Sequence, residues 1–339
     1  MSESLHTHTT LSDGKLSHLE LFELAESLGV TVLAYTDHDA VPDAKVLEVL
    51  ETLRHRATKW IIGIEISAAL PKDMGGAHVG NLHILGLFVD PANPQLRKHC
   101  SKAQIARVER MEGMVRRLND LGFVISAEDC LRESGGESVG RPHIVSALAA
   151  HPENTAIMEG LRQKMQEEAK EDPLIARAYE QMMAKGESQY PYALFLSPEA
   201  FRPAYEEHRY MPDLDEAAAL IRGAGGVAIL AHYFSVARQI DMPAFERLIA
   251  EGRLDGAEIV YGLRMEGTPE AARVEADRAS IAEILRRHKA VPAGGSDAHT
   301  REDLEYFASQ SRFSDMTNGL TRAILATGRV QKAFSSFDE

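Results

Sequence analysis

The segment VTVLAYTDHD, residues 30–39, shows how this chain is built. Its first six residues form a largely apolar run of the length expected for a strand that is buried on both faces. Its last four residues are Thr36, Asp37, His38 and Asp39. The three ionisable side chains among them cannot be core packing and must be solvated, paired or bound to a metal ion. Just upstream, residues 16–28 have an apolar stripe with helical spacing that ends at Gly29, a common helix C-cap.

Other short apolar runs repeat this arrangement along the chain. They are the run into Leu5 and residues 60–66, 82–89, 227–230, 257–260 and 290–293. Helical patterns lie at residues 214–222, 243–250 and 270–288, so strands and helices alternate. Seven such strands with helices between many of them predict a parallel α/β architecture.

Residues 95–209 break this alternation. The stretch is rich in Ala, Glu, Arg, Met and Gln, and it predicts one long helix at residues 102–121 and one or two more at 158–185. We therefore expect a barrel-like α/β core, built from residues 1–94 and 210–330, with residues 95–209 as a mainly helical insertion that caps the substrate. The tail after Ala333 is expected to be loose.

Composition limits the classes of function. The formal net charge of −14 disfavours a broad surface for duplex nucleic acid, but it is compatible with a small anionic substrate at a local metal cluster. The two cysteines form no CxxC motif, no apolar run approaches the roughly 18 residues that span a bilayer, and the acidic N-terminus does not resemble a signal peptide. We expect a cytoplasmic protein with reduced thiols, no membrane contact and a small-molecule substrate.

Potential metal ligands lie in or just after six of the apolar stretches. His6 and His8 alternate in an extended segment, so both side chains can face one metal ion. Glu65 lies inside the apolar run Ile62–Ile66, where a carboxylate is costly unless it meets a metal ion or, alternatively, a buried Arg or Lys. In parallel α/β folds the carboxyl ends of strands gather ligands and catalytic groups. The other candidates are Asp13, His38, His83, His232, Asp297 and His299.

Each of these residues has an ordinary explanation by itself, such as a surface histidine or a hydrogen-bonded core histidine. Their recurrence at successive strand ends favours a metal centre. The set contains imidazole and carboxylate groups and no thiolate, which favours catalytic zinc, manganese or iron over a closed structural zinc site. The set is also too large for one ion, so two or three divalent ions that share Glu65 are expected.

The sequence Gly140-Arg141-Pro142-His143 predicts a helix start, because proline suits the first turn of a helix. A helix N-terminus attracts anions, and Arg141 and His143 could bind a phosphate group there. The alternative is an ordinary helix start with an exposed arginine.

Other basic residues differ in their expected role. Arg264, shortly after the apolar run that ends at Val260, is a weaker candidate for a phosphate contact. Lys102, Arg107 and Arg110 fall on the predicted long helix and are expected to be solvated there.

Taken together, these residues closely resemble the PHP family, named for its polymerase and histidinol phosphatase members. The resemblance follows the family's order through nearly the whole chain. It implies a distorted (β/α)7 barrel, in agreement with the predicted strands. It rests on Leu5-His6-Thr7-His8, Ser12-Asp13-Gly14, Thr36-Asp37-His38-Asp39, Gly63-Ile64-Glu65, His83, Ala231-His232 and Gly295-Ser296-Asp297-Ala298-His299.

The resemblance also implies a role for each ligand. Two positions depart from the family's pattern: Ser4 stands where an Asp usually precedes the first histidine, and Tyr233 stands where a Pro often follows His232. Tyr233 is expected to line the substrate pocket instead. The first ion would be held by His6, His8, Glu65 and Asp297, the second by Glu65, His83 and His232, and the third by Asp13, His38 and His299.

The Gly-Arg-Pro-His motif within a helical insertion resembles the branch with 3′,5′-nucleoside bisphosphate phosphatases and 5′ exonucleases of short RNA, in which Arg141 and His143 would contact the phosphate. We expect hydrolysis of a phosphate monoester, of a nucleotide or nucleoside 3′,5′-bisphosphate, by a hydroxide that bridges the metal ions. Either His143 or His232 could protonate the leaving oxygen. The expected catalytic residues are Glu65, Arg141, His143 and His232, and the expected substrate contacts are Arg141, His143, Tyr233 and Arg264.

Other functions stay open at this point. The same centre could serve a 5′–3′ exonuclease of short RNA or DNA oligonucleotides, or a phosphatase for another small phosphorylated metabolite. More remote alternatives are an amide or lactone hydrolase and a non-catalytic metal-binding protein, the latter disfavoured by the complete ligand set. A covalent phosphoenzyme is not expected, because the chain has no GxSxG motif.

Overall fold

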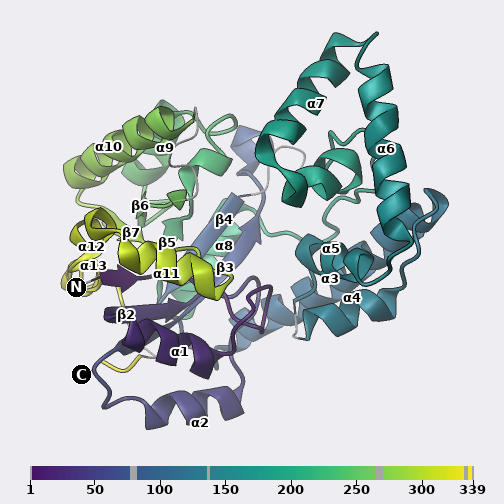
Figure 1. Cartoon of the computed structure of the whole chain (residues 1–339). Coiled ribbons are helices and arrows are strands. Elements are labelled where there is room, and N and C mark those ends of the chain that lie inside the picture. Colours follow the sequence, from purple (N-terminus) through teal and green to yellow (C-terminus); the bar gives the residue numbers. More distant parts are fainter. Residues whose placement is uncertain (1, 77–81, 136–137, 264–269, 332–334, 338–339) are drawn as a thin grey trace. The chain divides into compact units, whose positions relative to one another are not determined.

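The structure is a computed structural model that describes residues 2–76, 82–135, 138–263, 270–331 and 335–337. The chain divides into two compact units, one of residues 1–103 and 211–339 and the other of residues 104–210 (Figure 1). The boundaries predicted from the sequence, after residues 94 and 209, lie close to these. Helix α3 (Pro94–Asp120) continues across the first of them.

A seven-stranded sheet, with its strands in the order of the sequence, forms the centre of the larger unit (Figure 1). The strands β2 to β7 overlap the predicted apolar runs and β1 directly precedes Leu5, so the predicted α/β fold class is confirmed. The strands are β1 (Ser2–Ser4), β2 (Val30–Tyr35), β3 (Lys59–Ala68), β4 (Leu82–Leu87), β5 (Val227–Leu230), β6 (Gly256–Val260) and β7 (Val291–Gly294).

Strand β4 runs against its neighbours, so the prediction of a purely parallel sheet is wrong. β4 pairs antiparallel with β3 and β5, whereas the other neighbouring strands are parallel. The described part of the segment between β3 and β4 contains one short helical turn, Lys72–Met74. The reversal brings the first residues of β4, among them His83, to the edge at which the parallel strands end.

The sheet closes on itself into a barrel. Beyond β1, the Leu5 N–H donates to the Gly294 carbonyl at 3.1 Å and the His8 N–H donates to the Ala298 carbonyl at 2.9 Å. Thr7 and Ala298 form a parallel bridge in the same stretch. The first and last strands are therefore joined, as the distorted barrel expected from the sequence requires.

The helices of the larger unit pack against the strands of this barrel or against one another. They are α1 (His18–Ser27), α2 (Ala44–Thr52), α8 (Leu214–Gly223), α9 (Met242–Ala250), α10 (Ala271–His288), α11 (Arg301–Ser309), α12 (Ser311–Thr317) and α13 (Leu320–Ala326). α1 packs on β2, α8 on β4 and β5, α10 on β6, α12 on β1, and α13 on β7. Alternate strand residues form two separate cores, one with Trp60 and Tyr261 and one with Leu85 and Ile229. None of the described helices is both long and apolar enough to cross a membrane.

The described residues of the smaller unit are helical, in agreement with the predicted helices at 102–121 and 158–185. Besides part of α3 they form α4 (Ala127–Ser134), α5 (Arg141–Ala149), α6 (Asn154–Glu168), α7 (Pro173–Lys185) and a π-helical turn, Tyr192–Leu196. This unit has its own hydrophobic core, which includes Met114, Leu118, Phe123 and Phe195. The smaller unit is therefore a separate packing unit.

The described part of the C-terminal tail is not loose as expected. The Ser336 N–H donates to the Trp60 carbonyl at 3.0 Å, and the Trp60 N–H donates to Ser336 Oγ at 2.7 Å. Ser335 forms an antiparallel bridge with Ile61. Both serines are buried, although serine is a polar residue, because this segment pairs with the backbone of β3.

Candidate active site

The carboxylate of Glu65, within β3, is surrounded by imidazoles. Among the described residues no lysine or arginine forms an ion pair with it, so the alternative of a buried salt bridge to a basic residue does not hold. Its neighbours are His83 Nδ1 (2.9 Å) and His232 Nε2 (3.1 Å) at Oε1, and His38 Nδ1 (2.9 Å), His8 Nε2 (3.3 Å) and His6 Nε2 (3.4 Å) at Oε2.

The same five imidazoles form a closed ring around Glu65. They belong to segments far apart in the chain, which meet at one edge of the barrel. Each pair of neighbours has ring centroids 4.5–5.8 Å apart, in the order His6, His8, His38, His83, His232 and back to His6. Such crowding of imidazoles around one carboxylate is the arrangement expected of a shared metal centre.

Five of the distances among four donors of this site match the spacing of ligands around one ion. The Nε2 atoms of His6 and His8 are 3.2 Å apart. Asp297 Oδ1 lies 3.4 Å from the first and 3.2 Å from the second, and Glu65 Oε2 lies 3.4 and 3.3 Å from them. Four donors at the corners of a tetrahedron, each about 2.0–2.1 Å from one ion, would be about 3.3–3.4 Å apart. These four groups therefore fit a single divalent ion.

Asp13 centres another set of donors beyond His8. Asp13 Oδ1 lies 3.4 Å from His299 Nε2 and 3.8 Å from His8 Nδ1, and Asp13 Oδ2 lies 3.9 Å from His38 Nε2. Each of these four residues offers one ligand atom, and the four atoms lie within 4.8 Å of one another. They can hold a second ion, with His8 turned toward both sets.

His38 also faces two sets of donors, whereas the resemblance assigned it to the third ion alone. Its Nδ1 lies 2.9 Å from Glu65 Oε2 and its Nε2 lies 3.9 Å from Asp13 Oδ2. His38, Glu65 and His83 form a group with ligand atoms within 4.8 Å of one another, and His232 joins it through Glu65. Shared ligands of this kind suit a cluster of ions rather than separate sites.

Asp37 orders the loop that follows His8. Its carboxylate accepts the Thr9 N–H at 2.8 Å and the Ser12 hydroxyl at 2.7 Å. The loop then turns back so closely that a Cβ on Gly14 would lie 2.3 Å from the His8 carbonyl oxygen. Only glycine fits this turn, which explains the residue after the aspartate of the Ser-Asp-Gly motif.

Glu258, on β6, supports ligands from two other strands, and the sequence analysis missed it. Its side chain is buried, Oε1 accepts from His6 Nδ1 at 3.1 Å, and Oε2 accepts the backbone N–H of His232 at 2.6 Å. The first bond places the ring proton of His6 on Nδ1 and turns the Nε2 lone pair toward the ligand set. The second holds His232 at a φ of +24°, a conformation that residues other than glycine rarely adopt.

Ser4 has a different role from the aspartate usual at its position in the family. Its hydroxyl accepts the Ser296 N–H at 3.0 Å and lies 2.9 Å from Ser296 Oγ, so it ties β1 to the segment before Asp297. The carboxylate that contacts His6 Nδ1 comes from Glu258 instead. The serine therefore does not leave the first histidine without support.

The electrostatics of the site act differently on its carboxylates and on its several imidazoles. Burial by itself would raise the pKa of Glu65, but the nearby imidazoles, led by His83, hold that pKa well below its usual value. Burial, together with His299 and His38, lowers the pKa of His8 to about 4. Metal ions bind ionised carboxylates and neutral imidazoles, so Glu65 and His8 have the required forms at neutral pH. Burial by itself would lower the pKa values of His6, His232 and His299, but the neighbouring carboxylates raise them instead, so these imidazoles would release protons when metal ions bind.

The donors also fit divalent ions because two of their oxygens lack ordinary partners. Asp13 Oδ1 and Glu65 Oε2 are buried and accept no hydrogen bond from the part of the chain that the structure describes. A buried carboxylate oxygen is costly without compensation, and an ion between it and the adjacent imidazoles would supply the missing interaction. The chemistry of the set, imidazole and carboxylate without thiolate, suits zinc, manganese or iron.

In the smaller unit, Arg141 and His143 lie in the first turn of α5, at the predicted helix start. Arg141 Nη1 donates to the Leu196 carbonyl at 3.2 Å, and the guanidinium lies 5.5 Å from the ring centre of Tyr192. His143 is buried, and its Nδ1 accepts the Gly140 N–H at 2.9 Å. The proton of the neutral His143 ring is therefore assigned to Nε2.

Arg110 is not solvated, so that prediction is wrong. It is 6% exposed, its Nε donates to the Glu206 carbonyl at 2.7 Å, and its guanidinium lies 4.9 Å from the ring centre of Tyr205. The guanidinium of Arg141 lies 6.0 Å from the same ring. Burial, together with Arg141 and Arg107, lowers the pKa of Arg110 to about 10, against the opposing effect of Tyr205. We call Arg107, Arg110 and Arg141 the arginine cluster; such crowded cations favour a bound anion.

Of the two remaining predicted substrate contacts, Tyr233 can be placed in the structure. Tyr233 is 3% exposed, its hydroxyl donates to the Ile240 carbonyl at 2.7 Å, and its ring packs against Phe245. Its side chain is therefore part of the core, and we leave it out of the proposed substrate contacts. Arg264 lies outside the described residues.

Comparison with known proteins agrees with this geometry. The profile of the PHP domain matches residues 4–260. The chain is 26% identical over 307 residues to a 3′,5′-nucleoside bisphosphate phosphatase of Chromobacterium violaceum, covering 88% of this chain and 91% of that protein. It is 25% identical over 300 residues to the 5′-3′ exoribonuclease Rnm of Salmonella typhimurium, covering 87% and 84%.

A solved structure is similar over nearly the whole chain. It is that of a protein from Bifidobacterium adolescentis assigned as a metal-dependent phosphoesterase, with a TM-score of 0.65 and 25% sequence identity. The similarity covers 96% of this chain and 95% of the other. Both units are thus included in the likeness.

Proposed function

Because this chain belongs to the PHP family and is a metal-dependent hydrolase of phosphoesters, we propose that it removes phosphate from a small nucleotide, with a nucleoside 3′,5′-bisphosphate as the preferred substrate. The observation that carries the proposal is the close approach, at 3.2–3.4 Å, of the His6 and His8 Nε2 atoms to each other, to Glu65 Oε2 and to Asp297 Oδ1. The first relative named above, the nucleoside bisphosphate phosphatase, supports the choice of substrate.

We propose a separate role for each of the main residues of the site. Divalent ions, when bound, would supply an activated water and would neutralise charge on the phosphoryl oxygens. Glu65 gathers the histidines through both of its oxygens, and Glu258 orients His6. We propose that Arg141, with Arg110, binds a phosphate group of the substrate, because a planar guanidinium pairs well with phosphate oxygens.

Of the two histidines that could protonate the leaving oxygen, we propose His143. His232 contacts Glu65 Oε1 through Nε2 at 3.1 Å, within the group of candidate metal ligands, and Ser235 Oγ through Nδ1 at 2.9 Å, so we assign it to metal binding. The Nδ1 atom of His143 accepts a backbone N–H, so its Nε2 carries a proton that can be donated. A glutamine at position 143 would keep some hydrogen bonding but could not transfer a proton.

A second candidate is exonuclease activity on short oligonucleotides, which the similarity to the Salmonella exoribonuclease favours. It requires hydrolysis of a phosphodiester instead of a monoester at the same centre. Products separate the two: inorganic phosphate from a bisphosphate, and a nucleoside 5′-monophosphate from a 5′-phosphorylated oligonucleotide.

The test is a substrate panel with the purified full-length chain supplied with Mn²⁺. The panel contains adenosine 3′,5′-bisphosphate, 3′-AMP, 5′-AMP, ribose 5-phosphate and a 5′-phosphorylated RNA trimer, with phosphate release and product masses measured. We expect the bisphosphate to give the highest kcat/KM. Glu65→Gln should abolish both metal loading and turnover, whereas the exposed Glu48→Gln should change neither. Turnover of the bisphosphate no faster than that of ribose 5-phosphate would contradict the proposed substrate class.

A further inference from the structure

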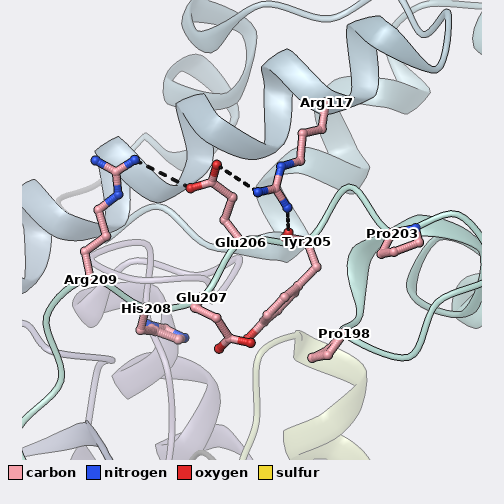
Figure 2. A pocket seen from close by; sticks show the side chains of 8 residues that line it. All are labelled: Arg117, Pro198, Pro203, Tyr205, Glu206, Glu207, His208 and Arg209. Atoms are coloured by element: carbon pink, nitrogen blue, oxygen red, sulfur yellow. Dashed lines mark hydrogen bonds and ion pairs between the residues drawn. The ribbon is translucent and has the colours of Figure 1, made fainter. Parts of the chain in front are cut away.

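The smaller unit contains a pocket of about 540 Å³, a size typical of sites for small organic ligands (Figure 2). It lies between the C-terminal half of α3 and the segment that leaves the helical bundle. Its walls combine an aromatic ring and two prolines with charged groups. The lining residues are Arg117, Pro198, Pro203, Tyr205, Glu206, Glu207, His208 and Arg209.

The basic residues of this pocket are already neutralised. Figure 2 shows the Glu206 carboxylate between two guanidiniums, at 3.5 Å from Arg117 and 3.6 Å from Arg209. Arg209 also pairs with Glu109 at 3.3 Å. By contrast, Glu207 forms no hydrogen bond or ion pair that the described residues show. The pocket therefore has no surplus of positive charge for a phosphate, and it presents a carboxylate that can accept hydrogen bonds.

The position of Glu206 depends on a glycine in the facing helix. A Cβ on Gly113 would lie 2.2 Å from the Glu206 carboxyl carbon, so the carboxylate occupies the space that a side chain would fill. Glycine inside a helix is unfavourable relative to alanine, and here it lets Glu206 reach both arginines. The wall that carries Tyr205, Glu206 and Glu207 is thus fixed by packing against α3.

Tyr205 connects this pocket to the arginine cluster. Its ring faces the guanidiniums of Arg110 and Arg141, and the same residue lines the pocket. A ligand that extends from the arginine cluster past Tyr205 would need an anionic end and an uncharged, planar end with hydrogen-bond donors. A nucleotide has both parts, a phosphate and a base.

We propose that this pocket binds the nucleobase of the substrate. Tyr205 and the two prolines would contact the base, and the Glu207 carboxylate would accept a hydrogen bond from its exocyclic amino group. This inference rests on the proposed function and adds a specificity residue to it. Glu207 would favour bases that carry an amino group, such as adenine, over analogues that lack it. A carboxylate aimed at an amino group is a means of direct base selection.

The test measures binding of nucleosides to the full-length chain by ligand-observed NMR, without catalysis. The probes are adenosine, purine riboside, which lacks the amino group, and ribose. The variants are Glu207→Gln and, as matched control, Glu199→Gln, an exposed glutamate near the pocket that does not line it. We expect adenosine to bind about 3–10-fold more tightly than purine riboside, a ratio set by one hydrogen bond to a charged group at an open site. Glu207→Gln should reduce that ratio to near one, and Glu199→Gln should leave it unchanged.

The outcomes separate this inference from the proposed function. Hydrolysis of nucleoside bisphosphates together with equal binding of adenosine and purine riboside would refute the base site and leave the proposed function in place. Selective, Glu207-dependent binding of adenosine without hydrolysis of any nucleotide would support the base site and refute the proposed substrate. Failure of adenosine to bind the wild-type chain, or equal effects of Glu207→Gln and Glu199→Gln, would also overturn the base site.

Discussion

Replacing Glu258 with glutamine should weaken metal binding while the barrel stays folded. Glu258 accepts two hydrogen bonds in a buried position, from His6 Nδ1 at 3.1 Å and from the His232 N–H at 2.6 Å. A glutamine has the same shape, but its amide oxygen can accept only one of these bonds, and its NH2 group would face the other donor.

The expected magnitude follows from these contacts. Leaving one buried donor unsatisfied costs about 1–3 kcal/mol, which for a protein of this size lowers the melting temperature by roughly 2–12 °C. Loss of an outer-shell partner of a metal-bound histidine typically lowers metal affinity by about 10–100-fold. Glu258→Gln should therefore lose affinity for Mn²⁺ or Zn²⁺ by a factor in that range.

The assay is equilibrium dialysis of chelator-treated protein against graded metal concentrations, with bound ions counted by mass spectrometry. Thermal unfolding of the metal-free variants measures the structural part of the effect separately. Glu48→Gln, the same exchange at an exposed position on α2, is the control. If Glu258→Gln bound ions as tightly as Glu48→Gln does, the carboxylate would not orient His6 and the reasoning would be refuted.

Three further predictions follow from other contacts. Arg141→Lys should lower kcat/KM about 10–100-fold with metal content unchanged, because a lysine cannot form the paired hydrogen bonds of a guanidinium. The control is Arg116→Lys at an exposed position on α3, and equal kinetics of the two variants would exclude a phosphate contact of Arg141. Gly113→Ala should raise helix stability by up to about 1 kcal/mol but displace Glu206 and weaken adenosine binding, as thermal unfolding and NMR would measure. Burial, with Asp129 nearby, raises the pKa of the Cys130 thiol to about 12, so iodoacetamide at pH 8 should label Cys130 far more slowly in the folded chain than in urea; similar rates would show that the thiol is accessible.

The strands and the ligand positions could be predicted because each has a local cause in the sequence. A strand such as β2 is a short apolar run, and the change to Thr36-Asp37-His38 marks its end without any knowledge of the fold. The direction of β4 had no such local signal, because apolar runs look alike in parallel and antiparallel strands. It depends on how β4 pairs with β3 and β5 in the folded sheet.

Glu258 could have been found by the argument that found Glu65. Both are glutamates inside apolar strand sequences, and both are almost completely buried in the structure. The difference is that Glu258 belongs to no ligand motif, so only its burial cost pointed to a partner. A buried carboxylate in a strand is therefore a signal in itself, even where no histidine stands beside it in the sequence.

Arg110 illustrates the opposite limit. On a helix with many polar residues, nothing in the sequence distinguishes an inward-facing arginine from a solvated one. Its burial depends on residues 204–206, almost a hundred positions later, which place a tyrosine ring and a backbone carbonyl against it. Such a contact is a property of the tertiary structure, and only the packed helical unit could reveal it.

The distribution of charge explains how an acidic chain can take an anionic substrate. The net charge of −14 lies largely on exposed side chains, where salt screens it within about 10 Å. Two places differ from this exterior. One is the group of histidines around Glu65, which would bind divalent cations. The other is the arginine cluster, where Arg110 is buried and where Arg110 and Arg141 donate to backbone carbonyls. Because buried charges are screened far less than exposed ones, we propose that these two places select the anion despite the acidic exterior.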